Sequence, residues 1–365
     1  MKEKTKKIFR LVLLSLFCIL LGAAIFYFIV KKYPNYFSEN IIKVEKDVTV
    51  TDVGIADAVE KVYNSVVVIN TYKKNVLYSS GSGFIYRIDG DHSYIITNHH
   101  VIDSGEEFKV SYTDGETVVA SLVGSDEYAD VAILKTETKE GYSASIIGKS
   151  DDMRVGDTTF TIGAPLGDVY SWTVTRGILS GKERLVEVSL SSSYQSDYIM
   201  NVLQTDSAVN SGNSGGPLCN SNGEVIGVIN AKISASGVEG IGFAIPIEVA
   251  IEKAEEIING KSSSYPYLGI TMYNVANAIS SPLYNSYLTK NKITYGVIVV
   301  DIEANSPAFS AGIKANDIII KINDNKVSNI AYLRYQLYKS TKNDKIVLTV
   351  IRDGNTKEIE VDLSK

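Results

Sequence analysis

The feature that most restricts the fold of this chain is a long series of short segments rich in Val, Ile, Tyr and Phe, which begins near residue 57. Segments of this length and composition are typical of β-strands. Their close and even spacing favours an antiparallel barrel or sandwich over alternating strands and helices. The sequence therefore predicts a mainly β protein. The segments include SVVVINTY, GSGFIYR, SYIITN, DVAILKT, TTFTIGAP, EVIGVINA and GIGFAIP, with turn residues such as Asp89-Gly90 and Asp114-Gly115 between them.

A second unit follows the strand-rich region. Residues 247–260 predict a helix, because apolar residues recur there at helical spacing. Residues 259–265 are expected to be a linker. Residues 266–365 then contain further strand-like runs, a helical stretch at 329–340 and a terminal hairpin that turns at Asp353-Gly354. This combination suits a small α+β domain.

The N-terminus predicts a membrane anchor. Residues 1–10 carry four lysines and one arginine, and residues 11–30 contain no charge. Twenty such residues match the bilayer core, which is about 30 Å thick, at about 1.5 Å per residue. Large side chains and Lys31-Lys32 follow instead of a small-x-small cleavage site, which favours an uncleaved signal anchor. Residues 31–54 are expected to form a stalk, and lysines on both sides give only a weak preference for a cytoplasmic N-terminus.

Composition excludes several other classes of protein. The formal net charge is −6 and the body has no Lys/Arg cluster, which argues against nucleic-acid binding. The chain has two cysteines, and Cys18 lies in the apolar run apart from Cys219, so no intradomain disulfide is expected. The sequence has neither a phosphate-binding loop nor Cys/His pairs at metal-ligand spacing, so no cofactor and no metal is implied.

The stretch NSGNSGGPL, residues 210–218, carries the clearest chemical signal. Ser214 lies among glycines, and a serine nucleophile needs a tight turn with N–H groups that face the developing oxyanion. It also needs a base, and TNHHVID offers His99 and His100. Asp130, at the start of the run DVAILKT, can orient an imidazole. Each residue alone has an ordinary structural explanation, but the three kinds together on an all-β background favour nucleophilic catalysis.

These stretches, in this order, resemble trypsin-like serine proteases of the HtrA/Deg family. The matching phrases in residues 55–258 are GSGFI, ITNHHVI, DVAILK, IGAPLG, TVTRGILSG, GNSGGPL and GIGFAIP. The resemblance implies a double antiparallel β-barrel for residues 55–258. YLGI and SPAFSAGIKANDIIIKIND are similar to segments of bacterial PDZ domains, which implies a PDZ domain at residues 266–365. An anchor, a protease domain and one PDZ domain are the plan of a membrane-bound member of this family.

The resemblance also implies roles for individual residues. The family's catalytic histidine directly precedes the apolar pair of its T-N-x-H-V-I phrase, and this position is His100. His99 is then a neighbour that points to the other face. Asp130 is the orienting carboxylate and Ser214 the nucleophile. The oxyanion donors that the resemblance implies are the backbone N–H groups of Gly212, Asn213 and Ser214.

Three further expectations concern specificity and control. In trypsin-like folds the floor of the substrate pocket lies about six residues before the nucleophile. That position is Ala208 here, with Ile229 and Ile241 as expected walls, which predicts cleavage after a small or medium apolar residue. Asn213 replaces the aspartate that pairs with a new N-terminus in digestive trypsins, so activation by cleavage is not expected. Residues 182–200 lie where the family has its sensor loop, and a flexible insertion is an equal alternative.

The PDZ resemblance implies a site for C-terminal peptides. The carboxylate-binding loop maps to Tyr267, Leu268, Gly269 and Ile270. Successive backbone N–H groups there can surround a peptide carboxylate, and the peptide can then add as a strand beside residues 270–274.

The sequence therefore predicts an ATP-independent serine endopeptidase in the cell membrane. Its N-terminus is expected in the cytoplasm and its two domains outside it. The expected partners are unfolded or misfolded substrate proteins and C-terminal peptides. The family resemblance further implies a homotrimer, with Val53, Ile55 and Val59 as candidate contacts. Two alternatives stay open, a PDZ-based chaperone with little proteolysis and a protease dedicated to one signalling substrate.

Overall fold

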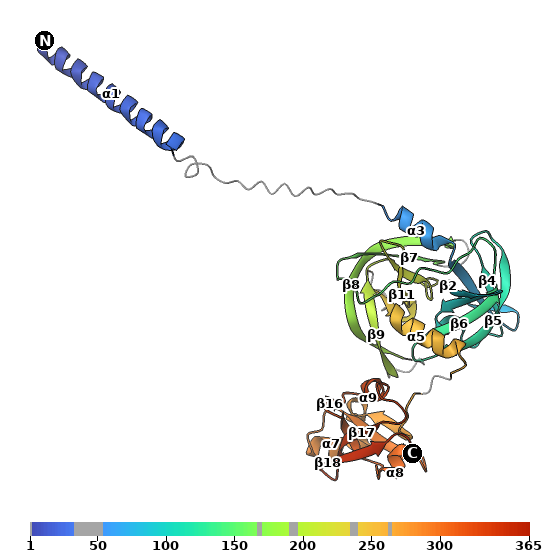
Figure 1. The fold of residues 1–365 in the computed structure, drawn as a ribbon. Helices are drawn as coiled ribbons and strands as arrows, with labels where there is room; N and C mark the ends of the chain where they lie inside the picture. The colour runs from blue at the N-terminus through green and yellow to red at the C-terminus, as the bar shows by residue number, and fades with distance from the viewer. Residues whose placement is uncertain (1, 33–53, 166–169, 190–195, 234–239, 262–264) are drawn as a thin grey trace. The chain divides into compact units, whose positions relative to one another are not determined.

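The computed structural model describes residues 2–32, 54–165, 170–189, 196–233, 240–261 and 265–365, in two units, Met1–Val53 and Gly54–Lys365. In the first unit, α1 (Lys2–Lys32) is a continuous helix (Figure 1). Its part Phe9–Lys32 is the one stretch in the described residues that is long and apolar enough to cross a membrane. By length and composition it fits a membrane anchor or a signal sequence. Val53, one of the candidate trimer contacts, lies outside the described residues.

The second unit begins with α3 (Ala56–Tyr63) and a closed antiparallel barrel (Figure 1). The strands follow one another in the spatial order β1-β2-β3-β6-β5-β4. Closure pairs every strand on both sides, so the barrel has no free edge. The strands are β1 (Val66–Lys73), β2 (Val76–Asp89), β3 (His92–Thr97), β4 (Glu107–Ser111), β5 (Thr117–Asp126) and β6 (Val131–Glu137).

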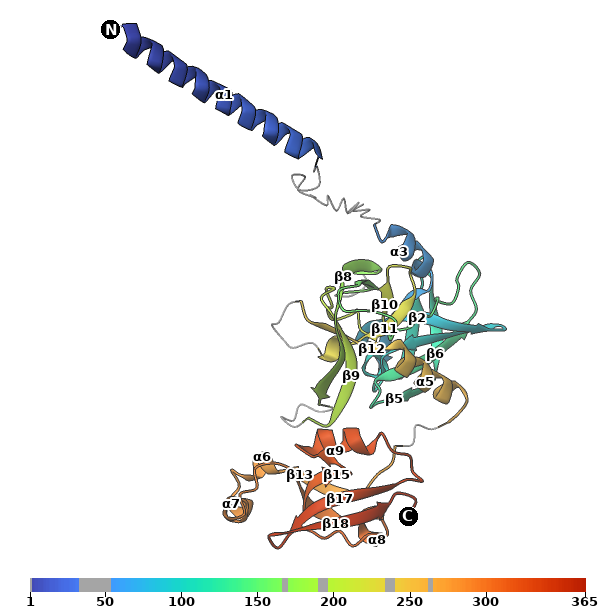
Figure 2. The same ribbon diagram turned by 60° about the vertical axis from the view of Figure 1, so that its left-hand side comes forward.

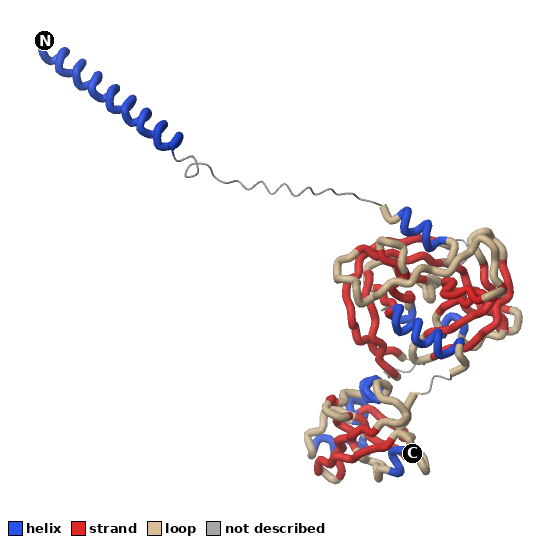
Figure 3. Tube along the Cα trace, in the orientation of Figure 1, coloured by secondary structure: helices blue, strands red, loops and turns tan. Residues whose placement is uncertain are grey.

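A second closed antiparallel barrel follows, in the order β10-β11-β12-β9-β8-β7. Strands dominate both barrels (Figure 3), which confirms the predicted mainly β fold. Helix α5 (Ile247–Ile258) follows the last strand, as the helical spacing predicted. The strands are β7 (Thr158–Gly163), β8 (Thr173–Val188), β9 (Tyr198–Thr205), β10 (Pro217–Asn220), β11 (Val225–Ile229) and β12 (Gly242–Pro246).

The barrels bury both faces of several strands, which explains their unbroken apolar runs. On β1, Val67 lies in the core of the first barrel, whereas Val66 belongs to the core between the two barrels. On β3, Ile95 and Ile96 divide in the same way. Successive side chains of a strand point to opposite faces, so each face of these strands meets a different core. The residues just after β3 and just before β6 therefore adjoin strands that are packed on both faces.

Two parts of the segment 182–200, where the family's sensor loop is expected, lie in paired strands. β8 extends to Val188 and β9 begins at Tyr198, and Leu185 pairs with Asn201. The alternative of a flexible insertion is therefore wrong for residues 182–188 and 198–200, whereas residues 190–195 lie outside the described part of the chain. Val186 and Val188 lie at alternating positions in KERLVEV, which suits a strand. The long partner strand β9 provides the pairing, which the local sequence does not reveal.

Residues 265–365 form a smaller sheet with the strand order β13-β14-β15-β17-β18 (Figure 2). β13 lies at the edge of the sheet, where a further strand can pair with it. The terminal hairpin turns at Asp353-Gly354 as predicted. The strands are β13 (Ile270–Asn274), β14 (Val297–Ile302), β15 (Ile318–Ile322), β16 (Asn325–Lys326), β17 (Lys345–Arg352) and β18 (Asn355–Asp362), and the helices are α6 (Val275–Ala278), α7 (Pro282–Lys290), α8 (Pro307–Ser310) and α9 (Ile330–Leu337).

Candidate active site

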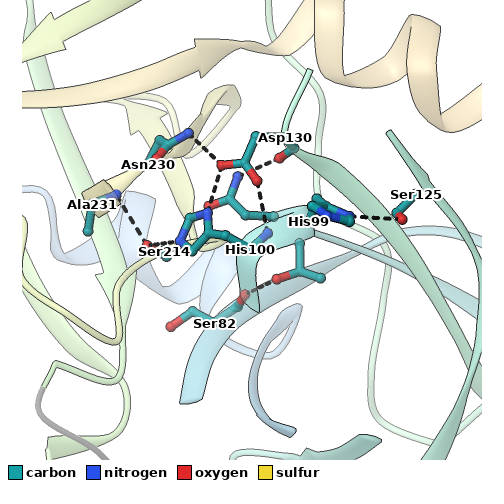
Figure 4. A network of polar contacts seen from close by, with 10 residues as sticks. Ser82, His99, His100, Ser125, Asp130, Ser214, Asn230 and Ala231 are labelled. Carbon is teal, nitrogen blue, oxygen red and sulfur yellow. Dashed lines mark hydrogen bonds and ion pairs between the residues drawn. The ribbon is translucent and has the colours of Figure 1, made fainter. Parts of the chain in front are cut away.

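The structure brings His100, Asp130 and Ser214 together between the barrels (Figure 4). His100 lies in the short helix α4 (His99–Ile102) that follows β3, and Ser214 precedes β10 in the other barrel. The Nε2 atom of His100 is 2.9 Å from the Oγ atom of Ser214, and its Nδ1 atom is 2.7 Å from the Oδ2 atom of Asp130. A hydroxyl, an imidazole and a carboxylate thus form one chain of hydrogen bonds, the arrangement that activates a serine nucleophile.

Asp130 is held firmly in this arrangement. It is 3% exposed, and its backbone has a φ of 52°, a conformation that costs energy for a residue other than glycine. The Oδ1 atom accepts a hydrogen bond of 2.9 Å from the backbone N–H of His100. The side-chain amide of Asn98 also donates to the carbonyl of Asp130 at 2.9 Å. These contacts fix both the peptide and the carboxylate that face the histidine.

Asn230 is a site residue that the sequence analysis did not identify. Its Nδ2 atom donates to the Oδ2 atom of Asp130 at 2.7 Å, and its side chain is buried (Figure 4). The residue directly follows β11 in the stretch EVIGVINA, where the only predicted site residue was Ile229. A polar residue at the end of an otherwise apolar strand is the one local signal that could have indicated it.

The turn around Ser214 depends on Gly215. This glycine has a φ of 84°, and a Cβ atom there would lie 2.2 Å from the backbone oxygen of Ser82. Only glycine fits such a conformation and such a close approach. The backbone N–H of Ala231 donates to the Oγ atom of Ser214 at 3.2 Å. Because this oxygen accepts from Ala231, its own proton is available for the Nε2 atom of His100.

The oxyanion donors differ in part from the prediction. Within the described residues, the N–H groups of Gly212 and Ser214 donate to no acceptor, as an oxyanion site requires. The N–H of Asn213 instead donates to the carbonyl of Asn210 at 3.0 Å. Asn213 is therefore not an available donor in this conformation, because its amide hydrogen closes the turn. The hydroxyl of Ser82 donates to the carbonyl of Gly212 at 2.7 Å and fixes the neighbouring peptide.

The three expected pocket residues lie in different environments. Ile229 is 0% exposed and packs in the core of the second barrel with Leu179 and Leu203. Its assignment as a pocket wall is therefore wrong, because its place on β11 directs it inward. Ile241 is 38% exposed, and Ala208 is also exposed. These two remain candidates for contact with a substrate.

His99 lies apart from the hydrogen-bonded chain of the triad residues. Its Nδ1 atom is 3.0 Å from the Oγ atom of Ser125 on β5 (Figure 4). Adjacent residues in a helical turn point in different directions, so only one of the two histidines can face Ser214.

The loop Tyr267–Ile270 borders a groove of about 490 Å³. Gly269 has a φ of 72°, and a Cβ atom there would lie 2.2 Å from the Cβ atom of Ser306, so glycine is required. Within the described residues, the N–H groups of Leu268 and Gly269 have no acceptor. The edge strand β13 and helix α9 supply the two walls, through residues that include Thr271, Met272, Leu333, Arg334 and Leu337.

Two family models match the chain. Residues 81–228 match the model of the trypsin-like peptidase domain, and residues 266–363 match that of the PDZ domain. The chain is 38% identical over 328 residues to "Serine protease Do-like HtrB" of Bacillus subtilis, covering 86% of this chain and 71% of the relative. It is 40% identical over 292 residues to "Serine protease Do-like HtrA" of the same organism, covering 78% of this chain and 63% of that relative.

Solved structures agree with these matches. A serine endoprotease from Yersinia pestis superimposes with a TM-score of 0.62 at 28% identity, covering 85% of this chain and 97% of that one. A structure described as "HtrA-type protease AlgW with decapeptide" gives a TM-score of 0.63 at 27% identity, covering 85% of this chain and 98% of the other.

Proposed function

Because this chain belongs to the HtrA, or Do-like, family of serine proteases, we propose that it is a membrane-anchored endopeptidase that uses Ser214, His100 and Asp130. The proposal rests on two short contacts of His100. Its Nε2 atom lies 2.9 Å from the Oγ atom of Ser214, and its Nδ1 atom lies 2.7 Å from the Oδ2 atom of Asp130. In this proposal residues 55–258 cut proteins outside the cytoplasm, residues 11–30 anchor the chain, and residues 266–365 bind peptides.

Acylation follows from this geometry. The Oγ atom of Ser214 forms a bond to the carbonyl carbon of the substrate while its proton moves to the Nε2 atom of His100. Asp130 holds the other ring nitrogen, so that the imidazole keeps the right tautomer and its charged form is stabilised. The N–H groups of Gly212 and Ser214 stabilise the oxyanion, a contribution of about 3 kcal/mol for one donor in a comparable enzyme. The imidazolium then protonates the leaving amine as the peptide C–N bond breaks.

Deacylation repeats these steps with water. His100 takes a proton from the water as its oxygen attacks the acyl carbon, and the same proton returns to the Oγ atom of Ser214 when the ester bond breaks. Neither stage needs ATP, because hydrolysis of a peptide bond is favourable by itself. The proposed substrates are misfolded or specific proteins whose extended segments can reach the serine.

The peptide groove is the proposed control site. A C-terminal carboxylate binds at the loop Tyr267–Ile270, and the peptide pairs with the edge strand β13. Peptide binding shifts the protease between two states in proportion to its difference in affinity for them. We propose that the shift raises activity, by about tenfold for a coupling of roughly 1.4 kcal/mol.

The proposed assembly is a homotrimer. Ile55 and Val59 are half-buried against the core between the barrels, so only part of each side chain is left for another chain. Light scattering of the full chain in detergent, with the detergent mass subtracted, tests this proposal. Three chain masses are expected, and an active monomer would contradict it.

A fluorophosphonate probe on the full chain in detergent tests the proposed activity. Wild-type protein should be labelled at Ser214 and should cut unfolded casein, whereas Ser214→Ala should do neither. Labelling without casein cleavage would favour a dedicated protease over broad quality control. Absence of labelling with and without a C-terminal peptide would contradict the proposed enzyme and favour a PDZ-based chaperone.

A further inference from the structure

One residue of the double-barrel domain lies in the wall of the peptide groove. Tyr128, in the segment between β5 and β6, lines this groove together with Leu268, Leu337 and Tyr338. Its ring lies 5.2 Å from the ring of Tyr338, which directly follows α9, and 5.2 Å from that of Tyr265. These distances are those of direct aromatic contacts. The groove is therefore built from both domains.

The position of Tyr128 indicates which part of a peptide it would meet. Its partners Tyr265 and Tyr338 lie just before the loop Tyr267–Ile270 and just after α9. Both places are at the end of the groove where the carboxylate of a peptide would bind. Tyr128 is thus placed beside the last side chain of a bound peptide.

The segment that carries Tyr128 leads directly to Asp130. The Oδ1 atom of Asp126 accepts hydrogen bonds from the N–H groups of Tyr128 at 3.0 Å and Ala129 at 2.9 Å. Its Oδ2 atom accepts one from the hydroxyl of Tyr265 at 2.8 Å. Asp126 is only 2% exposed, so these bonds are shielded from water. The interdomain tyrosines and the orienting carboxylate are consequently the two ends of one short, tightly bonded segment.

A second hollow adjoins the same ring pair. It has a volume of about 180 Å³ and is also lined by Tyr128 and Tyr338, together with Tyr198 and Ile245. The Tyr128–Tyr338 pair thus lines both the peptide groove and this largely apolar space. The rings have room to shift when a ligand presses on them from the groove, which a fully packed core would not allow.

We infer that Tyr128 is a peptide-binding and positioning residue supplied by the protease domain, which packs against the last side chain of a C-terminal peptide and transmits its presence to Asp130. The inference rests on the proposed function, since it concerns the control of the same triad. It assigns the peptide an apolar, preferably aromatic, last residue, because the ring of Tyr128 offers an apolar face. The coupling runs through the bonded segment Asp126–Asp130.

Peptide binding to the full-length Ser214→Ala protein in detergent tests the first half. The probe is a fluorescent peptide that ends in Phe, compared with the same peptide ending in Ala. Tyr128→Ala should weaken binding of the Phe peptide by about threefold to tenfold, the range expected for one aromatic contact, and should affect the Ala peptide less. Tyr128→Phe keeps the ring and should bind like the parent protein. Unchanged affinity for the Phe peptide in Tyr128→Ala would overturn the inference.

The rate of fluorophosphonate labelling of Ser214 tests the second half, in proteins with Ser214 intact. The matched control is Tyr78→Ala, because Tyr78 is an exposed tyrosine on β2 of the protease domain and lines neither hollow. At saturating peptide, Tyr78→Ala should keep the wild-type ratio of labelling rates with and without peptide. Tyr128→Ala should bring this ratio close to one. A wild-type ratio in Tyr128→Ala at saturation would overturn the coupling.

Two further measurements keep the result decisive. If Tyr128→Ala does not fold, as judged by its thermal melt, Tyr338→Ala removes the other ring of the pair and should lower the ratio in the same way. A wild-type ratio in that variant would also overturn the coupling. If wild-type Ser214 is never labelled, the proposed protease function fails, while the peptide-binding comparison in Ser214→Ala still decides the place of Tyr128.

Discussion

The side-chain amide of Asn230 and the Nδ1 atom of His100 both contact the same oxygen of Asp130, each at 2.7 Å. This shared Oδ2 atom belongs to a carboxylate that is nearly inaccessible to solvent. Two donors on one oxygen fix the rotation of the carboxylate as well as its position. Asn230 comes from the second barrel and Asp130 from the first, so this bond also ties the two barrels together at the site.

Asn230→Ala should lower kcat by about tenfold to a hundredfold with little change in KM. The reason is that a hydrogen bond to a charged group contributes about 1.5–3 kcal/mol, and Asp130 would lose one of its donors. Steady-state kinetics on a peptide substrate measure the effect. Asn222→Ala, at an exposed position, is the matched control and should behave like wild type. A change in KM alone would contradict a positioning role.

The two adjacent histidines should behave very differently. His100→Ala should abolish hydrolysis, since loss of the base costs about 10⁶ in turnover in a comparable triad. His99→Ala should keep most activity, because its ring contacts Ser125 and not Ser214. Cleavage of casein by both variants measures this difference. Activity in His100→Ala together with none in His99→Ala would show that the register is wrong.

The residue before the cut should be small or medium and apolar. Ala208 lies at the expected floor position, and an alanine side chain offers a basic residue no charged partner. An unpaired buried charge costs several kcal/mol, so Arg and Lys should be strongly disfavoured. A peptide library read by mass spectrometry gives the preference directly. Enrichment of Arg or Lys at this position would refute the assignment of the floor.

Alkaline pH should weaken the interdomain contact. Burial and the carboxylate of Asp126 raise the pKa of Tyr265 above its ordinary value of 10.0. Above that value the unfolded chain binds fewer protons than the folded one, so the free energy of unfolding falls as the pH rises. Thermal melts at pH 7 and at about pH 10.5 measure this fall, which should be smaller in Tyr265→Phe. An identical fall in that variant would exclude a contribution from Tyr265.

The sequence alone determined the order of the domains, the β class and the triad candidates. These rest on local patterns. GNSGGPL needs its glycines for one tight turn, and the apolar runs need two buried faces, so short stretches contain the information. The helix at α5 and the hairpin at Asp353-Gly354 followed from local spacing in the same way.

Only the tertiary structure decided which side chains meet. Asn230 lies 100 residues from Asp130 in sequence, and no local pattern records their contact. Ile229, next to it, turned out to be a core residue because the alternation along β11 directs it inward. The backbone N–H of Asn213 donates to the carbonyl of Asn210 and closes a turn, so it is not available to an oxyanion. Tyr128 lines the groove beside the loop Tyr267–Ile270 because two domains pack there. Contacts of this kind depend on the folded arrangement of the strands and not on neighbouring residues in the sequence.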